Sequence, residues 1–144
     1  MTEFGEYRHI VPVQIRFSDI DRLNHVNNAC YHNYIELGRV KYFEKVLGSE
    51  INWDKRGFVL ARTEMDHLEQ VYLNDDIYCC TRVFRFGNKS IGVQNAIIKK
   101  SDGRVLPCAE VKAVLVAMDY IENSSIPVPE RWKKLIAGFE GIKF

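Results

Sequence analysis

Apolar and polar residues alternate along residues 8–18, so every second side chain of an extended chain would lie on the same side. A period of two is typical of a half-buried β-strand. Pro12 cannot donate a hydrogen bond to a neighbouring strand, and it therefore indicates an edge position or the start of the strand. The side expected to face the core carries His9, Val11, Val13, Ile15 and Phe17.

The pattern becomes helical at about Asn28 and continues to about Leu47. Apolar and aromatic positions spread over much of the helix surface, which indicates a helix that is largely buried. Asn27 or Asn28 suits the N-cap, and Gly48 stands where a C-terminal cap belongs. This is the only long helix that the pattern predicts, and we expect the fold to wrap around it.

Four further strand patterns follow the helix, and turn residues separate them. Their connections are too short for parallel crossovers, so we expect these four strands to form an antiparallel meander. A short amphipathic helix that begins near Pro129 completes the pattern. The predicted fold class is α+β, with an antiparallel sheet of five to six strands wrapped around one long central helix, in a single domain over residues 1–144. The four strands are expected over residues 57–72, 77–86, 90–99 and 105–118.

Composition excludes several classes of function. A net charge of +1 gives no electrostatic reason to expect a nucleic-acid partner. No apolar run approaches the roughly 20 residues of a membrane helix, and the acidic, aromatic N-terminal residues do not resemble a signal peptide. The four cysteines form no C-x-x-C pair and lack the spacing of a zinc site. We therefore expect a cytoplasmic protein with reduced cysteines, no membrane contact and no metal.

The densest polar stretch of the chain covers residues 18–34, between the first strand and the long helix. It reads S-D-I-D-R-L-N-H-V-N-N-A-C-Y-H-N-Y and holds two carboxylates, two histidines and four asparagines. Burying such a cluster is costly unless its groups satisfy one another or take part in chemistry. We therefore expect the functional site here.

This stretch and the order of elements resemble the hot-dog fold acyl-CoA and acyl-ACP thioesterases, a superfamily that includes the 4-hydroxybenzoyl-CoA thioesterase type. The family motif has an Asp, a His four residues later, and then V-N-N-x-x-Y. In this sequence it falls on Asp21, His25, Asn28 and Tyr31, with Val26 and Asn27 between them. One departure is Leu23, which stands where the plant acyl-ACP enzymes carry a second polar residue.

Thioester hydrolysis requires an activated water or nucleophile and a group that stabilises the developing oxyanion. Asp21 is the candidate general base or nucleophile, and His25 could orient water, move a proton or polarise the carbonyl. Asn24 and Asn27 could hold His25 or the water. We expect the backbone N–H of Asn28, at the positive end of the helix dipole, to donate to the oxyanion. No metal is required, and the only coenzyme is the coenzyme A of the substrate.

Further residues are candidates for substrate binding. Tyr31 and Tyr34 could line the acyl pocket, although helical spacing is as typical of core residues. Glu64 could act as a second acid, or it could be a solvated or interface carboxylate. Lys89 and Ser90 look like the family's contact to the coenzyme A phosphates, and the neighbouring cations could equally be solvated strand ends. These neighbours are Lys99, Lys100 and Arg104.

Two other functions remain open at this point. The same fold supports dehydratases of hydroxyacyl thioesters, but these usually take their His and carboxylate from a different place on the fold. A non-catalytic protein that binds acyl thioesters would keep the pocket without turnover. The resemblance also implies a homodimer or homotetramer with sites at the subunit interface. The acyl group, and coenzyme A as opposed to acyl carrier protein, are not specified by the sequence.

Overall fold

The computed structural model describes residues 5–144, which form six strands and two α-helices. Two 3₁₀ turns, η1 (Phe17–Asp19) and η2 (Gly48–Glu50), flank the first helix. The other elements, in chain order, are β1 (His9–Val13), α1 (Asn28–Val46), β2 (Arg56–His67), β3 (Asp76–Phe86), β4 (Ser90–Ser101), β5 (Arg104–Asp119), β6 (Ser124–Ser125) and α2 (Glu130–Glu140).

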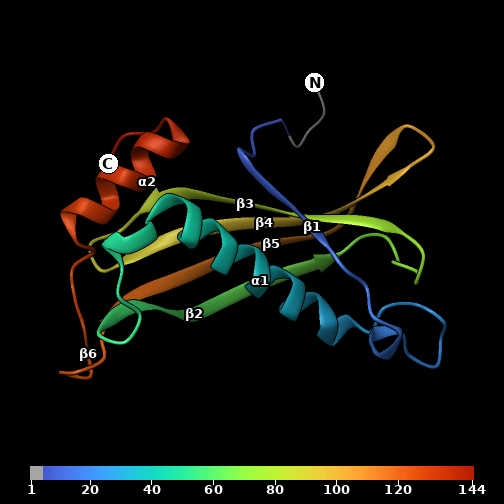
Figure 1. Ribbon diagram of the computed structural model, residues 1–144, viewed down its shortest axis with the longest axis horizontal. Coiled ribbons are helices and arrows are strands. Elements are labelled where there is room, and N and C mark those ends of the chain that lie inside the picture. The colour runs from blue at the N-terminus through green and yellow to red at the C-terminus, as the bar shows by residue number, and fades with distance from the viewer. Residues whose placement is uncertain (1–4) are drawn as a thin grey trace.

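All strands belong to one antiparallel sheet with the order β1-β3-β4-β5-β2, and the short β6 pairs with the end of β5. The sheet curls, α1 runs across one of its faces, and α2 packs at one end (Figure 1). A curled antiparallel sheet of five to six strands with two helices is consistent with the hot-dog fold. The predicted α+β class and the predicted number of strands are confirmed.

The predicted meander of four strands is wrong in one respect. β3, β4 and β5 form a meander, but β2 pairs with β5 and not with β3. The connection between β2 and β3, residues 68–75, passes the end of β5, where the Leu68 N–H donates to the Cys108 carbonyl at 2.9 Å. Eight extended residues reach roughly 26 Å, and three strand spacings need only about 14 Å, so this connection does not force its two strands to pair.

The first strand is shorter than the alternation predicted. Regular pairing with β3 ends at Val13, and Phe17, which was expected on the core side, is 84% exposed. The chain leaves the sheet because Asp19 closes a turn: its N–H donates to the Arg16 carbonyl, and its carboxylate accepts from the Arg16 N–H. The edge position that Pro12 indicated is confirmed, since β1 is the outermost strand beyond β3.

The core lies between α1 and the sheet. Tyr31, Tyr34, Ile35, Tyr42 and Phe43 of α1 are buried against it. Gly38 allows the helix to approach β3 closely, because a Cβ at this position would lie 2.4 Å from the Cys79 sulfur. The last turn of α2 is fixed to the same core by Glu140.

Glu140 is a buried carboxylate whose hydrogen bonds hold α2, α1 and β3 together. Its Oε2 accepts from the Tyr42 hydroxyl at 2.6 Å and from the Val83 N–H at 2.9 Å. The Val83 N–H is free to donate because the pairing of β3 with β4 shifts between Val83 and Arg85. Burial and the hydrogen bond to Glu140 raise the pKa of Tyr42, so this tyrosine stays protonated and acts as the donor.

Candidate active site at the start of α1

A hydrogen-bonded loop over residues 19–27 leads into α1. The Asp21 N–H donates to the His25 carbonyl at 3.0 Å, and the Asn27 N–H donates to the Asp19 carbonyl at 2.9 Å. Asn24 has a positive φ of 68°, a conformation that Asn tolerates better than most residues. The Val26 N–H donates to the Val71 carbonyl at 2.7 Å, which connects the loop to the segment after β2. These bonds fix the loop at both ends.

Asp19 is buried beneath this loop and is fully used in internal hydrogen bonds. Its carboxylate accepts from the Tyr34 hydroxyl at 2.5 Å, from the Arg16 N–H at 3.0 Å and from the Arg16 guanidinium at 3.1 Å. Burial alone would raise the pKa of Asp19, but the hydrogen bonds from Tyr34 and Arg16 outweigh it, and the pKa lies below its ordinary value. Asp19 is thus an ionised carboxylate that organises the turn.

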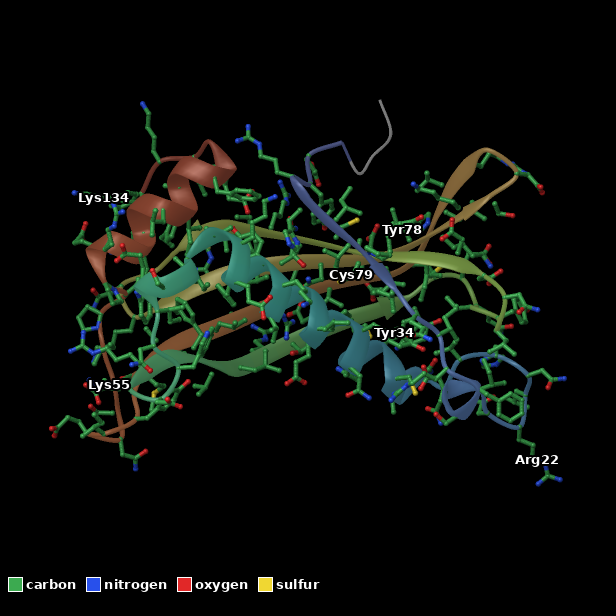
Figure 2. All side chains as sticks on the ribbon, viewed as in Figure 1. Arg22, Tyr34, Lys55, Tyr78, Cys79 and Lys134 are labelled. Atoms are coloured by element: carbon green, nitrogen blue, oxygen red, sulfur yellow. The ribbon has the colours of Figure 1, made fainter. Side chains whose placement is uncertain are left out.

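Asp21 lies only two residues later and is in a different environment. It is half-buried, and its Oδ1 accepts a single hydrogen bond, from the Leu23 N–H at 2.8 Å. The neighbouring Arg22 points away from the protein (Figure 2). Asn24, which was predicted to assist catalysis, is exposed at the tip of the loop, and its N–H donates to the Asp21 carbonyl. The carboxylate of Asp21 therefore keeps free acceptor positions.

The N-terminus of α1 has one backbone donor available. Asn27 is the N-cap, as predicted: its side chain accepts from the Ala29 N–H at 2.9 Å, and its carbonyl accepts from the Cys30 N–H. Asn28 is the first helical residue, so its N–H has no partner within the helix. Among residues 5–144 no other hydrogen bond is found for it. The donor expected to bind the oxyanion is thus available.

A hollow of about 300 Å³ opens beside this donor. The His25 ring contacts the Val26 carbonyl through Nδ1 at 3.2 Å. If Nδ1 carries the proton and donates to this carbonyl, Nε2 of the neutral ring is left as an acceptor. Tyr31 stacks edge-on against His67, with 5.0 Å between ring centroids, and burial raises the pKa of Tyr31 to about 12. The hollow is lined by His25, Asn28, Tyr31, His67, Leu68, Glu69 and Gln70.

His67 was not among the residues predicted for the site. It ends β2 and lines the same hollow as His25. The alternation along residues 57–72 did place His67 with Thr63 and Met65, on the face away from Arg62 and Glu64. What the pattern lacked was the position of β2 beside the start of α1, which depends on the sheet order.

Two other predicted binding residues lie away from the hollow. Tyr34 is buried in the N-terminal half of α1 and donates to Asp19 (Figure 2). Glu64 is exposed, pairs with Arg62 and lines a separate hollow together with Glu110 and Lys112. Direct contact of Tyr34 or Glu64 with a substrate stays a prediction. Within this chain, the geometry brings neither of them to the free N–H of Asn28.

Lys89 and Ser90 lie at the other end of the sheet from Asn28. Lys89 belongs to the turn between β3 and β4, where its carbonyl accepts from the Ala117 N–H at 2.8 Å, and Ser90 is the first residue of β4. This turn lies beside α2 and β6, whereas α1 begins at the opposite end (Figure 1). Lys99, also considered for phosphate binding, is 9% exposed and donates to Asp75 at 3.3 Å and to the Gln70 carbonyl.

The cysteines, possible metal ligands and possible membrane-spanning helices are the remaining features to consider. All four cysteines are free thiols, and burial raises the pKa of Cys79 and Cys80 to about 12 and that of Cys108 to about 11. Within residues 5–144 no group of three or more His, Cys, Asp or Glu side chains is arranged to hold a metal ion. In the same range, no helix has both the length and the apolar character needed to cross a membrane.

Comparison with known proteins places this geometry in a family. A thioesterase from Thermus thermophilus, solved with coenzyme A and zinc, is 29% identical, with a TM-score of 0.84 and coverage of 97% of this chain and 99% of that one. A thioesterase-superfamily protein from Jannaschia sp. is 21% identical, with a TM-score of 0.84 and coverage of 96% and 86%.

A variant of 4-hydroxybenzoyl-CoA thioesterase, solved with 4-hydroxybenzoyl-CoA, is 17% identical, with a TM-score of 0.79 and coverage of 88% and 96%. At these lower identities the likeness shows a shared fold. No curated protein is significantly similar to the chain in sequence. Residues 15–136 match the Thioesterase-like superfamily, and because this range is most of the chain, the protein belongs to that superfamily.

Proposed function

We propose that this protein hydrolyses acyl thioesters of coenzyme A or of acyl carrier protein at the start of α1. The observation that carries the proposal is the hollow in which the free N–H of Asn28 lies beside His25, the residue whose carbonyl accepts the backbone N–H of Asp21. Family membership and the coenzyme A complexes of the structural neighbours support it. α1 is then the central helix of a hot-dog fold.

The proposed reaction follows from these groups. A water oxygen attacks the thioester carbonyl carbon while Asp21 accepts a proton from that water. Negative charge develops on the carbonyl oxygen, where the Asn28 N–H and the positive end of the α1 dipole stabilise it. The C–S bond then breaks, which releases the carboxylic acid and a thiolate that takes up a proton. His25, through Nε2, would orient the water. Direct attack by Asp21 is the covalent variant of the same scheme.

We further propose that the working unit is a homodimer formed through β2, or a homotetramer built from such dimers. β2 is an edge strand with an unpaired side, and an open edge favours pairing. Antiparallel pairing of two β2 strands about a two-fold axis would set the Arg56 end of one against the His67 end of the other. The Arg56 end of the partner's β2 lies at the same end of the sheet as the partner's β3–β4 turn. The partner subunit's Lys89 and the partner subunit's Ser90 would therefore approach the coenzyme A phosphates.

The test is release of free thiol from short, long and aryl acyl-CoA thioesters by the wild type and by Asp21→Asn. We expect turnover of one acyl class, with kcat lowered by about 10²- to 10⁴-fold in the variant because the proton acceptor is lost. Asp102→Asn, in the exposed β4–β5 turn, removes the same charge at a residue that does not line the hollow and is the matched control. It should retain full activity.

Three outcomes would count against parts of the proposal. Turnover that survives Asp21→Asn would move the base to His25 or another residue of the hollow. Dehydratase activity would appear as loss of water from a hydroxyacyl thioester without thiol release. A folded protein that releases no thiol from coenzyme A or carrier-protein thioesters, yet melts at a higher temperature with acyl-CoA, would be a binding protein.

A further inference from the structure

A second hollow, of about 290 Å³, lies between α1 and β2. α1 and β2 also contribute residues to the hollow beside Asn28. His32 follows Asn28 by one turn of α1, and Met65 precedes His67 on the same face of β2. An acyl chain whose carbonyl lies at Asn28 would therefore extend into this second hollow. Its apolar lining includes Ile35, Val40, Phe43, Phe58, Leu60 and Leu115.

The lining of this hollow is mostly apolar, but it also includes Arg39, a buried cation that is only partly satisfied. The side chain of Arg39 is 9% exposed. Its Nε donates to the Asn95 side chain at 3.2 Å, and its Nη2 is buried with no hydrogen-bond partner. Glu36 also lines the hollow but does not occupy Nη2. Burial lowers the pKa of Arg39, while Cys79 and the Glu36 carboxylate oppose this shift.

A second unsatisfied polar atom lines the same hollow. The Thr63 hydroxyl, on β2, is buried without a hydrogen-bond partner. Across the described residues, three buried side-chain polar atoms lack a partner, and two of them, Arg39 Nη2 and Thr63 Oγ1, belong to this one hollow. Leaving buried donors unpaired is costly, and an alkyl chain alone would not satisfy them. Their presence here indicates a ligand that carries a polar acceptor.

We propose that Arg39 and Thr63 recognise a carboxylate at the far end of the acyl chain, so that the preferred substrates are thioesters of dicarboxylic acids. A guanidinium offers planar N–H donors that match a carboxylate, and a hydroxyl can donate one more hydrogen bond. The apolar residues around them suit the methylene chain. This inference rests on the proposed thioester site at Asn28 and adds the substrate class.

The spacing of residues along α1 and β2 also sets the length of the acyl chain. Arg39 follows Asn28 by eleven positions on α1, which is ~16 Å along the helix. Thr63 precedes His67 by four positions on β2, which is ~13 Å along the strand. Three bonds of an extended chain cover about 3.5 Å, so the span corresponds to roughly eleven to fourteen bonds. A dicarboxylic acyl group of about twelve carbons fits this distance.

The decisive comparison is between dodecanedioyl-CoA, as the monothioester, and dodecanoyl-CoA. These probes have the same length and differ only at the far end. We expect the wild type to prefer dodecanedioyl-CoA in kcat/KM by about 10-fold or more, mainly through KM, since the carboxylate lies far from the reacting carbon. Arg39→Met should lower kcat/KM for dodecanedioyl-CoA by about 10- to 100-fold and leave dodecanoyl-CoA equal or better.

Two further variants test whether a loss of preference reflects the carboxylate site and not misfolding. Lys41→Met removes an exposed cation from the same helix and should leave the preference unchanged. Thr63→Val keeps the shape of the side chain and should reduce the preference by about 3- to 10-fold. Equal kcat/KM values for the two thioesters in the wild type, or a preference that survives Arg39→Met, would overturn the inference.

A binding measurement separates this inference from the proposed hydrolase function. Calorimetric titration of the wild type and of Arg39→Met with free dodecanedioate needs no turnover. If the wild type cleaves no thioester but binds dodecanedioate more tightly than Arg39→Met does, the carboxylate site stands and hydrolysis fails. If it cleaves dodecanoyl-CoA but binds dodecanedioate no more tightly than Arg39→Met does, hydrolysis stands and the carboxylate site fails.

Discussion

Asp19 and Asp21 are two residues apart in one short motif, yet the fold places their carboxylates in different environments. Asp19 is 2% exposed, and its carboxylate accepts from Tyr34 and Arg16. Asp21 is half-buried and accepts one local hydrogen bond. A carboxylate whose lone pairs are all occupied supports structure, whereas one with free lone pairs can take a proton or attack a carbonyl. The pair thus separates a structural carboxylate from the proposed chemical one.

The largest expected effect is on stability, from Asp19→Asn. The substitution removes a buried anion. The Tyr34 and Arg16 donors then lie opposite an amide, which accepts hydrogen bonds through its oxygen only. We expect the free energy of unfolding to fall by about 3 kcal/mol. Denaturant unfolding of the variant and the wild type measures this. A loss below about 0.5 kcal/mol would contradict the structural role of Asp19.

Low pH should reduce the stability of the fold through the same carboxylate, Asp19. The folded-state pKa of Asp19 lies below 3.8, its value without the fold. The ionised form is therefore favoured by folding, and this contribution is complete above that pH and is lost as the pH falls through the lower, folded-state pKa. Melting temperatures measured from about pH 6 to about pH 2 should fall more steeply for the wild type than for Asp19→Asn. Parallel curves would contradict the assignment.

Tyr34→Phe should have a smaller effect of the same kind. It removes the 2.5 Å hydrogen bond to Asp19 but leaves both Arg16 donors in place. A hydrogen bond to a charged group typically contributes about 2 kcal/mol, and we expect a loss of that size in the free energy of unfolding. Combining this variant with Asp19→Asn should cost less than the sum of the two single losses, because both remove one interaction.

Asp21→Asn should have almost no effect on stability. Among the described residues, the Asp21 carboxylate has only the local hydrogen bond from the Leu23 N–H, which an asparagine oxygen can also accept. The free energy of unfolding should stay within about 0.5 kcal/mol of the wild type, even where thiol release is lost. A large destabilisation would show that Asp21 shares the structural role of Asp19 and would make its activity loss uninformative.

Much of the fold was predictable because its signals are local. Alternation located most of the strands, and the N-cap at Asn27 and the start of the long helix followed from asparagine chemistry. The place of β2 was not predictable in this way. Strand order depends on contacts between distant residues, such as β2 with β5, and a connection over residues 68–75 is compatible with more than one order. Position along the chain thus suggested the wrong neighbour for β2.

The candidate site was likewise predictable where its residues are close together in the sequence. Asp21, His25 and Asn28 belong to one continuous motif, and the structure keeps them around one loop and helix end. His67 comes from β2 and was missed because its neighbours depend on the sheet order. Lys89 and Ser90 were grouped with the motif through resemblance, although within one chain they lie at the far end of the sheet (Figure 1). Residues brought together by tertiary packing carry no such local signal.

The loop over residues 19–27 has a consequence for the dynamics of the site. The amide hydrogens of Asp21, Asn24, Val26 and Asn27 are all hydrogen-bonded, and the Val26 N–H reaches outside the loop to Val71. These amides should exchange with deuterium slowly, through openings that also disturb the segment after β2. The loss of conformational entropy needed to order Asp21 is therefore met during folding. A ligand that binds beside Asn28 meets a loop that is already arranged and does not have to order it.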